Sequence, residues 1–279
     1  MSYKIIIDSC GELSDEMKKS GVYVSVPLTL MVEGESIVDD ESFDQASFLK
    51  KVAESPNCPK SSCPSPERYR EAFDCGADRV YAVTLSANLS GSYNSAVLGQ
   101  NIYLEERPDA KVYVFNSRSA SVGETLIGLK IQECEEKGMA FEEVVDTVER
   151  YIAGQNTWFV LENLDTLRKN GRLSKVKALV ATALRIKPVM ASTPEGEITQ
   201  LDQARGMNKA LIKMVDAIVE KTEHPEKKTL AISHCNCPGR AKIVYDALME
   251  RLPFRDAVVL DTAGVSTMYA NDGGIIVVV

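Results

Sequence analysis

The segment Leu85-Ser86-Ala87-Asn88-Leu89-Ser90-Gly91-Ser92-Tyr93-Asn94-Ser95-Ala96 joins two periodic stretches through a run of small, hydroxyl-bearing residues. Before it, Arg79–Leu85 is short, apolar and rich in β-branched and aromatic residues, which predicts a buried strand. After it, Tyr93–Glu106 predicts a helix. The segment is therefore a loop that leads from a strand into a helix, the arrangement from which sheets covered by helices are built.

This loop is a candidate anion site. The first N–H groups of a helix have no partner within the helix and carry positive partial charge, so they favour a negative group. Gly91 would let a ligand approach the backbone, and the hydroxyls of Ser90 and Ser92 could donate hydrogen bonds. Two other small-residue loops after strands, Asp8-Ser9 and Asn116–Ser121, are weaker candidates. The alternative is a plain helix cap, in which a serine bonds the amides of its own helix.

The rest of the first half extends the alternation of strand and helix. Strands are predicted at Lys4–Asp8, Tyr23–Pro27, Leu28–Val32, Ser36–Val38 and Lys111–Phe115, and helices at Leu13–Lys18, Phe43–Ala53, Glu67–Cys75, Thr125–Lys137 and Phe141–Ala153. Four prolines within residues 55–66 predict a loop there. This order predicts an α/β fold whose N-terminal domain is a mostly parallel sheet flanked by helices.

The second half has a different order of elements. Strands are predicted at Trp158–Leu161, Lys187–Ser192, Glu197–Leu201, Thr229–Ser233, Ala257–Leu260 and Gly274–Val279. Helices are predicted at Asn208–Lys221 and Arg240–Arg251, and a further helix is predicted to follow Ser174 and end at Ala183. The turn Pro194-Glu195-Gly196 predicts a hairpin, so the C-terminal domain should contain a mixed α/β sheet with helices. We expect two domains, residues 1–155 and 156–279. They should pack closely, because no linker sequence separates them.

Composition limits the possible classes of function. The 279 residues have a formal net charge of −8, and the scattered lysines and arginines argue against a nucleic-acid partner. No apolar run approaches the ~18 residues of a membrane-spanning helix. The start of the chain, Met1–Asp8, lacks the pattern of a signal peptide. The seven cysteines are an odd number, and we expect reduced thiols in a cytoplasmic protein.

Catalytic patterns are sparse. The chain has no glycine-rich nucleotide motif, no GxSxG hydrolase motif and only two histidines, which favours a binding protein without catalytic residues or cofactor. Two alternatives stay open. One is an enzyme that acts on a small phosphorylated or acylated substrate, with Ser90 or Ser92 as nucleophile or anion clamp. The other is a thiol-based metal or redox protein that uses Cys235 and Cys237 beside His234, although a second ligand pair is missing.

Seven segments, in order along nearly the whole chain, carry a family resemblance. They are Ile7-Asp8-Ser9, Ser61-Ser62-Cys63-Pro64-Ser65-Pro66, the loop from Leu85 to Ala96, Asn116-Ser117 with Ser121-Val122-Gly123, Leu161-Glu162-Asn163-Leu164 through Gly171-Arg172-Leu173-Ser174, Ile186-Lys187-Pro188-Val189, and Ala204-Arg205-Gly206 to Lys209-Ala210. Together they resemble the DegV family of fatty-acid-binding proteins, which includes the carrier subunits of bacterial fatty acid kinase.

The resemblance implies a long-chain fatty acid, such as palmitate, in a tunnel between the two domains. Its carboxylate would be held at the small-residue loops. The family's hydroxyl in the Pro-Ser segment falls on Ser61, and the loop donors fall on Ser90, Gly91 and Ser92. A family arginine near the carboxylate falls on Arg205. The resemblance implies a carrier rather than an enzyme, with no cofactor besides the bound acid.

The sequence departs from the family near its C-terminus. The family often has His-x-Gly-Pro-Gly there, and the histidine joins the carboxylate network. Here Tyr269 takes that place, followed by Ala270-Asn271-Asp272. A phenol donates one hydrogen bond but is neutral at pH 7, so the site should be less positive, or Arg205 should carry more of it.

A basic segment indicates a possible protein partner. Arg172, with Arg168, Lys169 and Lys175, forms a local cluster of positive charge. The resemblance places this region near the ligand entrance and the contact with a fatty acid kinase. The alternative is a solvated helix face.

Overall fold

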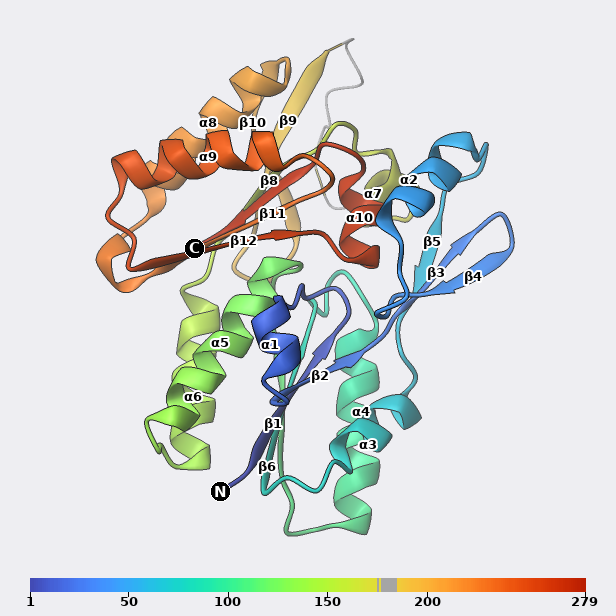
Figure 1. The fold of residues 1–279 in the computed structure, drawn as a ribbon, viewed down its shortest axis with the longest axis vertical. Coiled ribbons are helices and arrows are strands. Elements are labelled where there is room, and N and C mark those ends of the chain that lie inside the picture. Colours follow the sequence, from blue (N-terminus) through green and yellow to red (C-terminus); the bar gives the residue numbers. More distant parts are fainter. Residues whose placement is uncertain (175, 177–184) are drawn as a thin grey trace.

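A computed structural model describes residues 1–174, 176 and 185–279 (Figure 1). Its N-terminal part is built on a four-stranded, wholly parallel sheet with the strand order β2-β1-β6-β7. The strands are β1 (Tyr3–Asp8), β2 (Tyr23–Val26), β6 (Arg79–Thr84) and β7 (Lys111–Asn116). The predicted α/β fold with a parallel N-terminal sheet is confirmed.

Helices cover both faces of this sheet. They are α3 (Pro66–Phe73) and α4 (Ser92–Glu106) on one face, α5 (Val122–Glu136) and α6 (Phe141–Ala153) on the other, and the short α1 (Asp15–Lys19) before β2. Side chains alternate between the faces along each strand. Ile6 packs into the α3–α4 side, whereas Ile5 and Ile7 pack into the α5–α6 side. All three are fully buried, which explains why β1 reads as a continuous apolar run.

The C-terminal part is built on a six-stranded mixed sheet with the order β10-β9-β8-β13-β11-β12. Its strands are β8 (Thr157–Val160), β9 (Ile186–Ser192), β10 (Ile198–Arg205), β11 (Thr229–His234), β12 (Asp256–Asp261) and β13 (Ile275–Val278). β11 and β12 pair in parallel and the other described pairs are antiparallel, so the predicted mixed sheet is confirmed. The predicted helix that ends at Ala183 lies largely outside the described residues.

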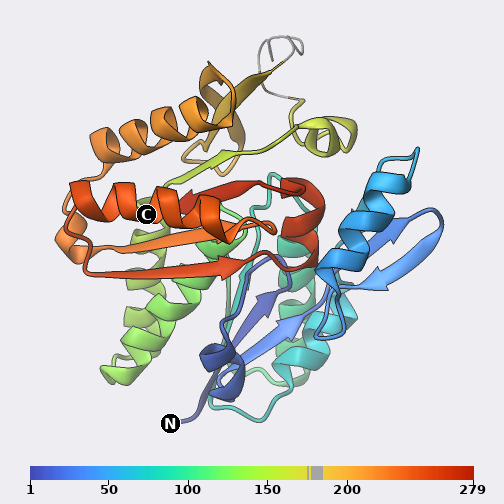
Figure 2. The same ribbon diagram turned by 45° about the horizontal axis from the view of Figure 1, so that its top comes forward.

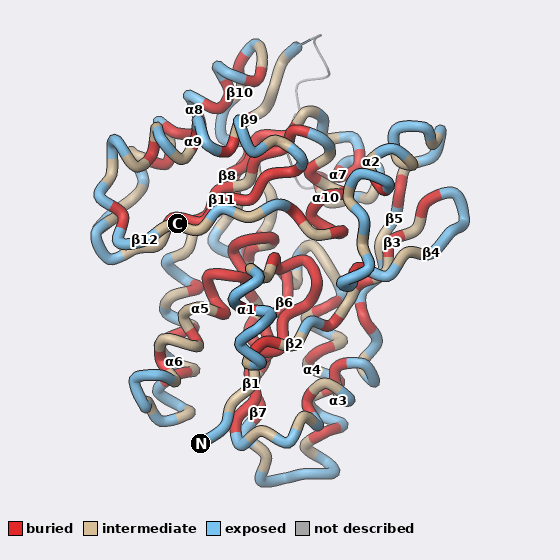
Figure 3. Tube along the Cα trace, viewed as in Figure 1, coloured by how far each residue is buried: buried red, intermediate tan, exposed pale blue. Residues whose placement is uncertain are grey.

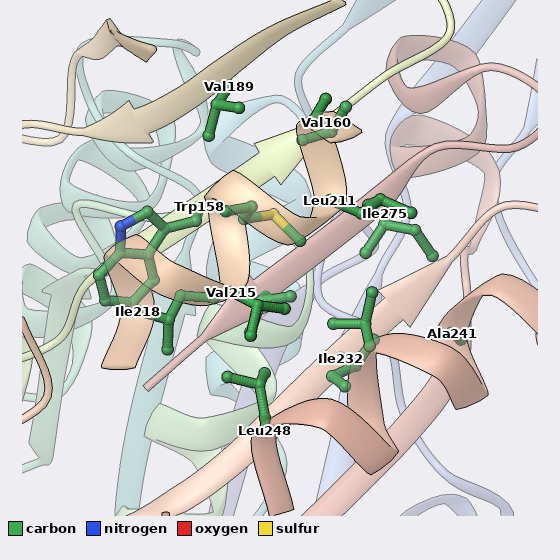
Figure 4. Close-up of a cluster of buried hydrophobic side chains, with 14 of the residues drawn as sticks. Trp158, Val160, Val189, Leu211, Val215, Ile218, Ile232, Ala241, Leu248 and Ile275 are labelled. Carbon is green, nitrogen blue, oxygen red and sulfur yellow. The ribbon is translucent and has the colours of Figure 1, made fainter. Parts of the chain in front are cut away.

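Two helices cover one face of the six-stranded sheet. They are α8 (Met207–Lys221) and α9 (Pro238–Arg251), which lie side by side above the strands in Figure 2. Figure 4 shows the core beneath them, where Trp158 and Ile232 of the sheet meet Leu248 of α9. The short helices α7 (Asp165–Lys169) and η1 (Pro225–Lys227) lie in connections between strands. None of the helices that the structure describes is long and apolar enough to cross a bilayer.

Helix α5 joins the two parts of the molecule. Ile127 packs into the core of the parallel sheet, whereas Val122 and Leu126 pack against Ala231 and Val278 of the six-stranded sheet. A helix that is buried on two sides has no single apolar stripe. The near-continuous burial of its first half follows from this position between two sheets.

A small antiparallel sheet projects beside the parallel one. Its order is β4-β3-β5, from β3 (Thr29–Val32), β4 (Glu35–Val38) and β5 (Lys60–Ser62). The prediction of a loop throughout residues 55–66 is wrong at residues 60–62. β5 is an edge strand, and the prolines lie on either side of it, so they remove no hydrogen bond from the ladder.

Helix α10 (Gly264–Ala270) is an element that the sequence did not predict. Its start is fixed by Asp39, whose buried carboxylate accepts hydrogen bonds from the amides of Gly264 (2.8 Å) and Val265 (2.9 Å). This cap ties the small sheet to α10, which also contacts α2 (Gln45–Glu54). A cap supplied from 225 residues earlier leaves no local signal in the sequence.

The two parts meet through buried loops above the parallel sheet, shown red at the centre of Figure 3. There the turn between β9 and β10 rests on the loop after β6. Ser86 Oγ donates to the carbonyl of Gly196 (2.7 Å), and Asn88 Nδ2 donates to that of Glu195 (2.7 Å). Gly196 has a φ of +81°, and a Cβ there would lie 2.6 Å from the Cα of Arg118. No side chain fits at this position.

We expect Gly196→Ala to lower the free energy of unfolding by about 2–4 kcal/mol, because overpacking adds to the strain of a positive φ. Gly34 is the matched control, since its φ is +77° and nothing lies within 4 Å of a Cβ placed there. Gly34→Ala should therefore show the backbone cost alone, about 1 kcal/mol. Urea unfolding measures both losses, and equal losses would contradict the steric account.

Candidate functional site

A cavity lies between the two parts of the chain. The centres of water-sized spheres can occupy about 110 Å³ of it. Such centres stay one radius away from the walls, so the space open to the atoms of a ligand is larger. Most of the wall is apolar and includes Leu28, Leu85, Leu89, Phe159, Leu161 and Leu167. A wall of this kind suits an aliphatic group, because neither the wall nor the ligand loses hydrogen bonds to water.

One end of the cavity is polar and partly exposed. It is formed by Ser61 of β5, Ser90 of the loop before α4, Arg172 after α7 and Tyr269 of α10, and we call these four residues the polar end. The hydroxyls of Ser61 and Tyr269 lie 3.3 Å apart, within hydrogen-bonding distance. The guanidinium carbon of Arg172 lies 5.9 Å from the centre of the Tyr269 ring. Burial raises the pKa of Tyr269, so its phenol keeps its proton at neutral pH and can donate.

The backbone fixes the position of Arg172. Its Nε donates to the carbonyl of Leu89 (3.0 Å), and its Nη1 donates to that of Asn170 (2.7 Å). These two bonds hold the guanidinium beside the loop that carries Ser90. The polar end thus combines three hydroxyls with one cation, a set of donors that matches a carboxylate.

The structure does not bring Gly91 or Ser92 to the cavity wall. The amide of Ser92 donates to Ser90 Oγ (3.2 Å), so that amide is already satisfied within the loop. The side chain of Ser92 is fully buried and bonds to Asp8 in the core, whereas Gly91 is exposed. Gly91 is the N-cap residue of α4, and the helix has no side-chain cap hydrogen bond, so neither serine caps it in the usual way. Of the three residues only Ser90 lines the cavity.

Arg205 is also placed away from the cavity. It is the last residue of β10 and is exposed, whereas Ile198 at the other end of that strand lines the cavity. Seven residues of extended chain separate the two, roughly 20 Å at ~3.3 Å per residue. The expectation that Arg205 assists a carboxylate has no support in this geometry, because the strand carries it outward.

The members of the basic segment lie in different environments. Arg168 is on the surface of α7, exposed and paired with Asp165 (3.1 Å), and Lys169 follows it as an exposed residue. Lys175 lies outside the described residues. Arg172 differs from Arg168 and Lys169 because its side chain lines the cavity.

The cavity has further polar walls, which the sequence did not identify as site residues. Ser119 Oγ lies 2.7 Å from Thr157 Oγ1, and Ser121 Oγ lies 2.6 Å from Ser233 Oγ. These hydroxyls bond one another and so need no ligand. The loop Asn116–Ser121 carried the signal of small residues after a strand, but nothing separated its lining residues from ordinary core.

Two alternative functions were left open by the sequence: an enzyme that uses Ser90, and a thiol or metal site at Cys235 and Cys237. Neither histidine lines the cavity, and its charged lining residues besides Arg172 are Arg118 and Glu197. His234 Nδ1 accepts a hydrogen bond from the amide of Cys237 (3.3 Å). Burial raises the pKa of Cys235 and of Cys237 to about 11, so both remain thiols at neutral pH.

The family model described as "Uncharacterised protein, DegV family" matches residues 2–279. This chain belongs to the DegV family. A DegV domain-containing protein of Streptococcus pneumoniae is 34% identical over 278 residues, which cover 99% of this chain and 98% of that protein. The resemblance stated from the sequence is therefore confirmed.

Crystal structures of other DegV proteins share the fold along the full chain. The DegV-family protein of Ruminococcus gnavus, refined with vaccenic acid, is 58% identical with a TM-score of 0.98 and covers 100% of both chains. The Streptococcus pneumoniae Fatty Acid Kinase (Fak) B3 protein, loaded with linoleic acid, is 34% identical with a TM-score of 0.90 and covers 100% of this chain and 99% of that one.

Buried carboxyl groups lie behind the cavity wall of this DegV protein. Asp8, Glu12 and Glu124 are all fully buried. Burial raises the pKa of Asp8 to about 6 and that of Glu12 to about 7, and it raises the pKa of Glu124 well above its usual range. Ser121 Oγ donates to Glu12 Oε2 (2.8 Å), and Ser121 lines the cavity. Glu12 thus titrates one layer behind the wall.

We expect Glu12→Gln to become more stable relative to the native protein as the pH rises from about 4.5 to 7. In that range the folded protein keeps the proton of Glu12 and the unfolded chain has released it, so the native protein loses stability as the pH rises. Glutamine has no such proton, and the difference should reach a few kcal/mol, at ~1.4 kcal/mol per pKa unit. Urea unfolding at several pH values measures it, with the exposed Glu16→Gln as control. Parallel curves for Glu12→Gln and the native protein would rule this out.

Proposed function

We propose that this chain binds a long-chain fatty acid in the cavity, with the carboxylate at the polar end and the acyl chain along the apolar wall. The observation that carries the proposal is an apolar cavity with one cation and three hydroxyls at its partly exposed end. The DegV relatives crystallised with vaccenic and linoleic acids support it. In this proposal residues 1–155 and 156–279 act as two domains that close over the ligand.

The acyl chain would supply most of the affinity. Burial of about a dozen methylenes at ~0.8 kcal/mol each gives about 10 kcal/mol before ordering costs. The head group would fix the position of the ligand instead. A buried carboxylate costs several kcal/mol unless it is paired and hydrogen-bonded. Arg172 would pair with it, and the hydroxyls of Ser61, Ser90 and Tyr269 would donate to its oxygens.

The same geometry favours a carrier over an enzyme. A hydrolase or transferase that used Ser90 would need a base to accept its proton, and no histidine lines the cavity. Both relatives above are described by the acid that they hold. We therefore infer that the chain binds the acid without altering it and needs no cofactor.

A carrier of this kind would present its ligand to a second protein. The name of the Streptococcus pneumoniae relative links that protein to a fatty acid kinase. In our proposal the cytoplasmic partner is such a kinase, which contacts the surface around Arg172, next to the exposed carboxylate end. Formation of acyl phosphate from the loaded protein by that kinase is the measurement that tests this step.

We expect Ile198→Trp to remove most of the bound lipid, because a larger side chain on β10 would fill the cavity that Ile198 lines. Leu201→Trp is the matched control, since Leu201 lies on the same strand but is exposed. Extraction of the purified proteins followed by mass spectrometry measures the acyl chains, and the melting temperature checks the fold. The native protein and Leu201→Trp should yield fatty acid. A native protein that yields none, and takes up no added palmitate or oleate, overturns the proposal.

The role of the cation is tested with Arg172→Met, which keeps the length of the side chain. We expect the affinity of defatted protein for oleate to fall about 10- to 100-fold, the value of a charge-assisted hydrogen bond. The methyl ester of oleate has no charge, so its binding should change little. Arg168→Met is the control, because Arg168 is exposed and lies off the cavity. An unchanged ratio of acid to ester affinity in Arg172→Met would show that the carboxylate lies elsewhere.

A further inference from the structure

A second cleft lies between the two parts of the chain, along the middle and later turns of α5. The centres of water-sized spheres can occupy about 700 Å³ of it, far more than in the first cavity. Its walls come from α5 and α6 on one side and from η1, β11 and β12 on the other. Nothing in the proposed lipid function uses this space.

The lining of the cleft is strongly basic. Five cationic side chains line it, and we call the space the basic cleft: Lys130, Arg150, Lys227, Lys228 and Arg255. Only two acidic side chains, Glu133 and Asp256, line it as well, so the described lining has an excess of three positive charges. An α-carboxylate at Val279, counted as a third negative group, would leave an excess of two. The chain as a whole has a net charge of −8, so the positive field is local to this cleft.

The acidic side chains do not neutralise all of these cations. Glu133 bonds Lys130 (3.1 Å) and lies 3.8 Å from Arg255. In the part of the chain that the structure describes, Lys227, Lys228 and Arg150 form no ion pair. Lys228 is the informative one, because it is half-buried. Its ammonium has a long contact to the carbonyl of Gly154 (3.4 Å) and an attraction to the carboxylate of Glu223 that does not offset the cost of burial. Burial lowers the pKa of Lys228, so its charge is costly there without an anion.

The remaining walls indicate the size and polarity of a ligand. Leu126, Leu129 and Tyr151 give the cleft an apolar side, and Thr229 adds a hydroxyl beside the cations. Gln155 also lines it. Lysine and arginine side chains that converge on one space match the charge and oxygen geometry of phosphate groups.

We propose that the basic cleft binds a small molecule that carries phosphate groups together with an apolar or aromatic part. A polymer such as RNA is less favoured, because the positive field is confined to the cleft of an acidic protein. The ligand would contact both parts of the chain at once. Its binding should therefore stabilise their packing and raise the melting temperature.

The test uses the full chain with three probes: ATP, pyrophosphate and inorganic phosphate, with sodium sulfate at matched ionic strength as the salt control. Calorimetry and melting temperature report binding. We expect saturable one-to-one binding of ATP or pyrophosphate with a Kd below about 1 mM. In Lys228→Met the affinity should fall at least about tenfold, the loss of one charge-assisted contact. Lys242→Met is the matched control, because Lys242 pairs with Asp246 on exposed α9 outside the cleft and should bind like the native protein.

Each other outcome overturns the proposal. Absence of saturable binding for all three probes, or an effect no larger than that of sulfate, would leave only general charge attraction. An equal loss in Lys242→Met and Lys228→Met would mean the same, and tighter binding of a single-stranded RNA than of ATP would identify a different ligand class. If Lys228→Met does not fold, the exposed Lys227→Glu variant replaces it with the same expected loss. The result is independent of the lipid proposal, because lipid content is measured separately.

Discussion

The carboxyl group of Asp8 fixes the loops from which the apolar cavity is built. It lies fully buried at the end of β1 and accepts the amides of Cys10 (3.1 Å) and Leu85 (3.0 Å). Loss of these bonds would leave a buried carboxyl with fewer partners, at a cost in free energy, so they hold the loop after β1 to the end of β6. Both Cys10 and Leu85 line the cavity. The shape of the wall therefore depends on this one group and on Glu124 beside it.

The elements were predictable where burial follows a period, and the site was predictable only in part. Helix α6 has such a period and β1 is a continuous apolar run, whereas α10 starts at a cap that is distant in sequence, so no local pattern indicated it. The family resemblance identified Ser61, Ser90 and Tyr269, which the tertiary fold brings to one end of the cavity. It also pointed to Arg205, which the direction of β10 places away from this cavity. From the sequence, Arg172 was assigned to a contact with a partner protein, and its position in the cavity wall was not predicted.

Two spaces of different chemistry lie along α5. Ser121, just before this helix, lines a narrow apolar cavity, and Lys130 in its middle turns lines the wide basic cleft. Between them Val122 and Leu126 are packed against the six-stranded sheet. One helix thus separates an apolar site from a charged one.

The link between Asp39 and the start of α10 has a consequence for how the cavity exchanges its contents. Asp39 belongs to the chain that follows the small sheet, which carries Ser61, and α10 carries Tyr269. Separation of these two elements would break the two hydrogen bonds that the buried carboxylate accepts from backbone amides, at a cost of several kcal/mol. One rim of the entrance is thus a single rigid piece. Movement of Arg172, which is held by the carbonyls of Leu89 and Asn170, would leave this link intact.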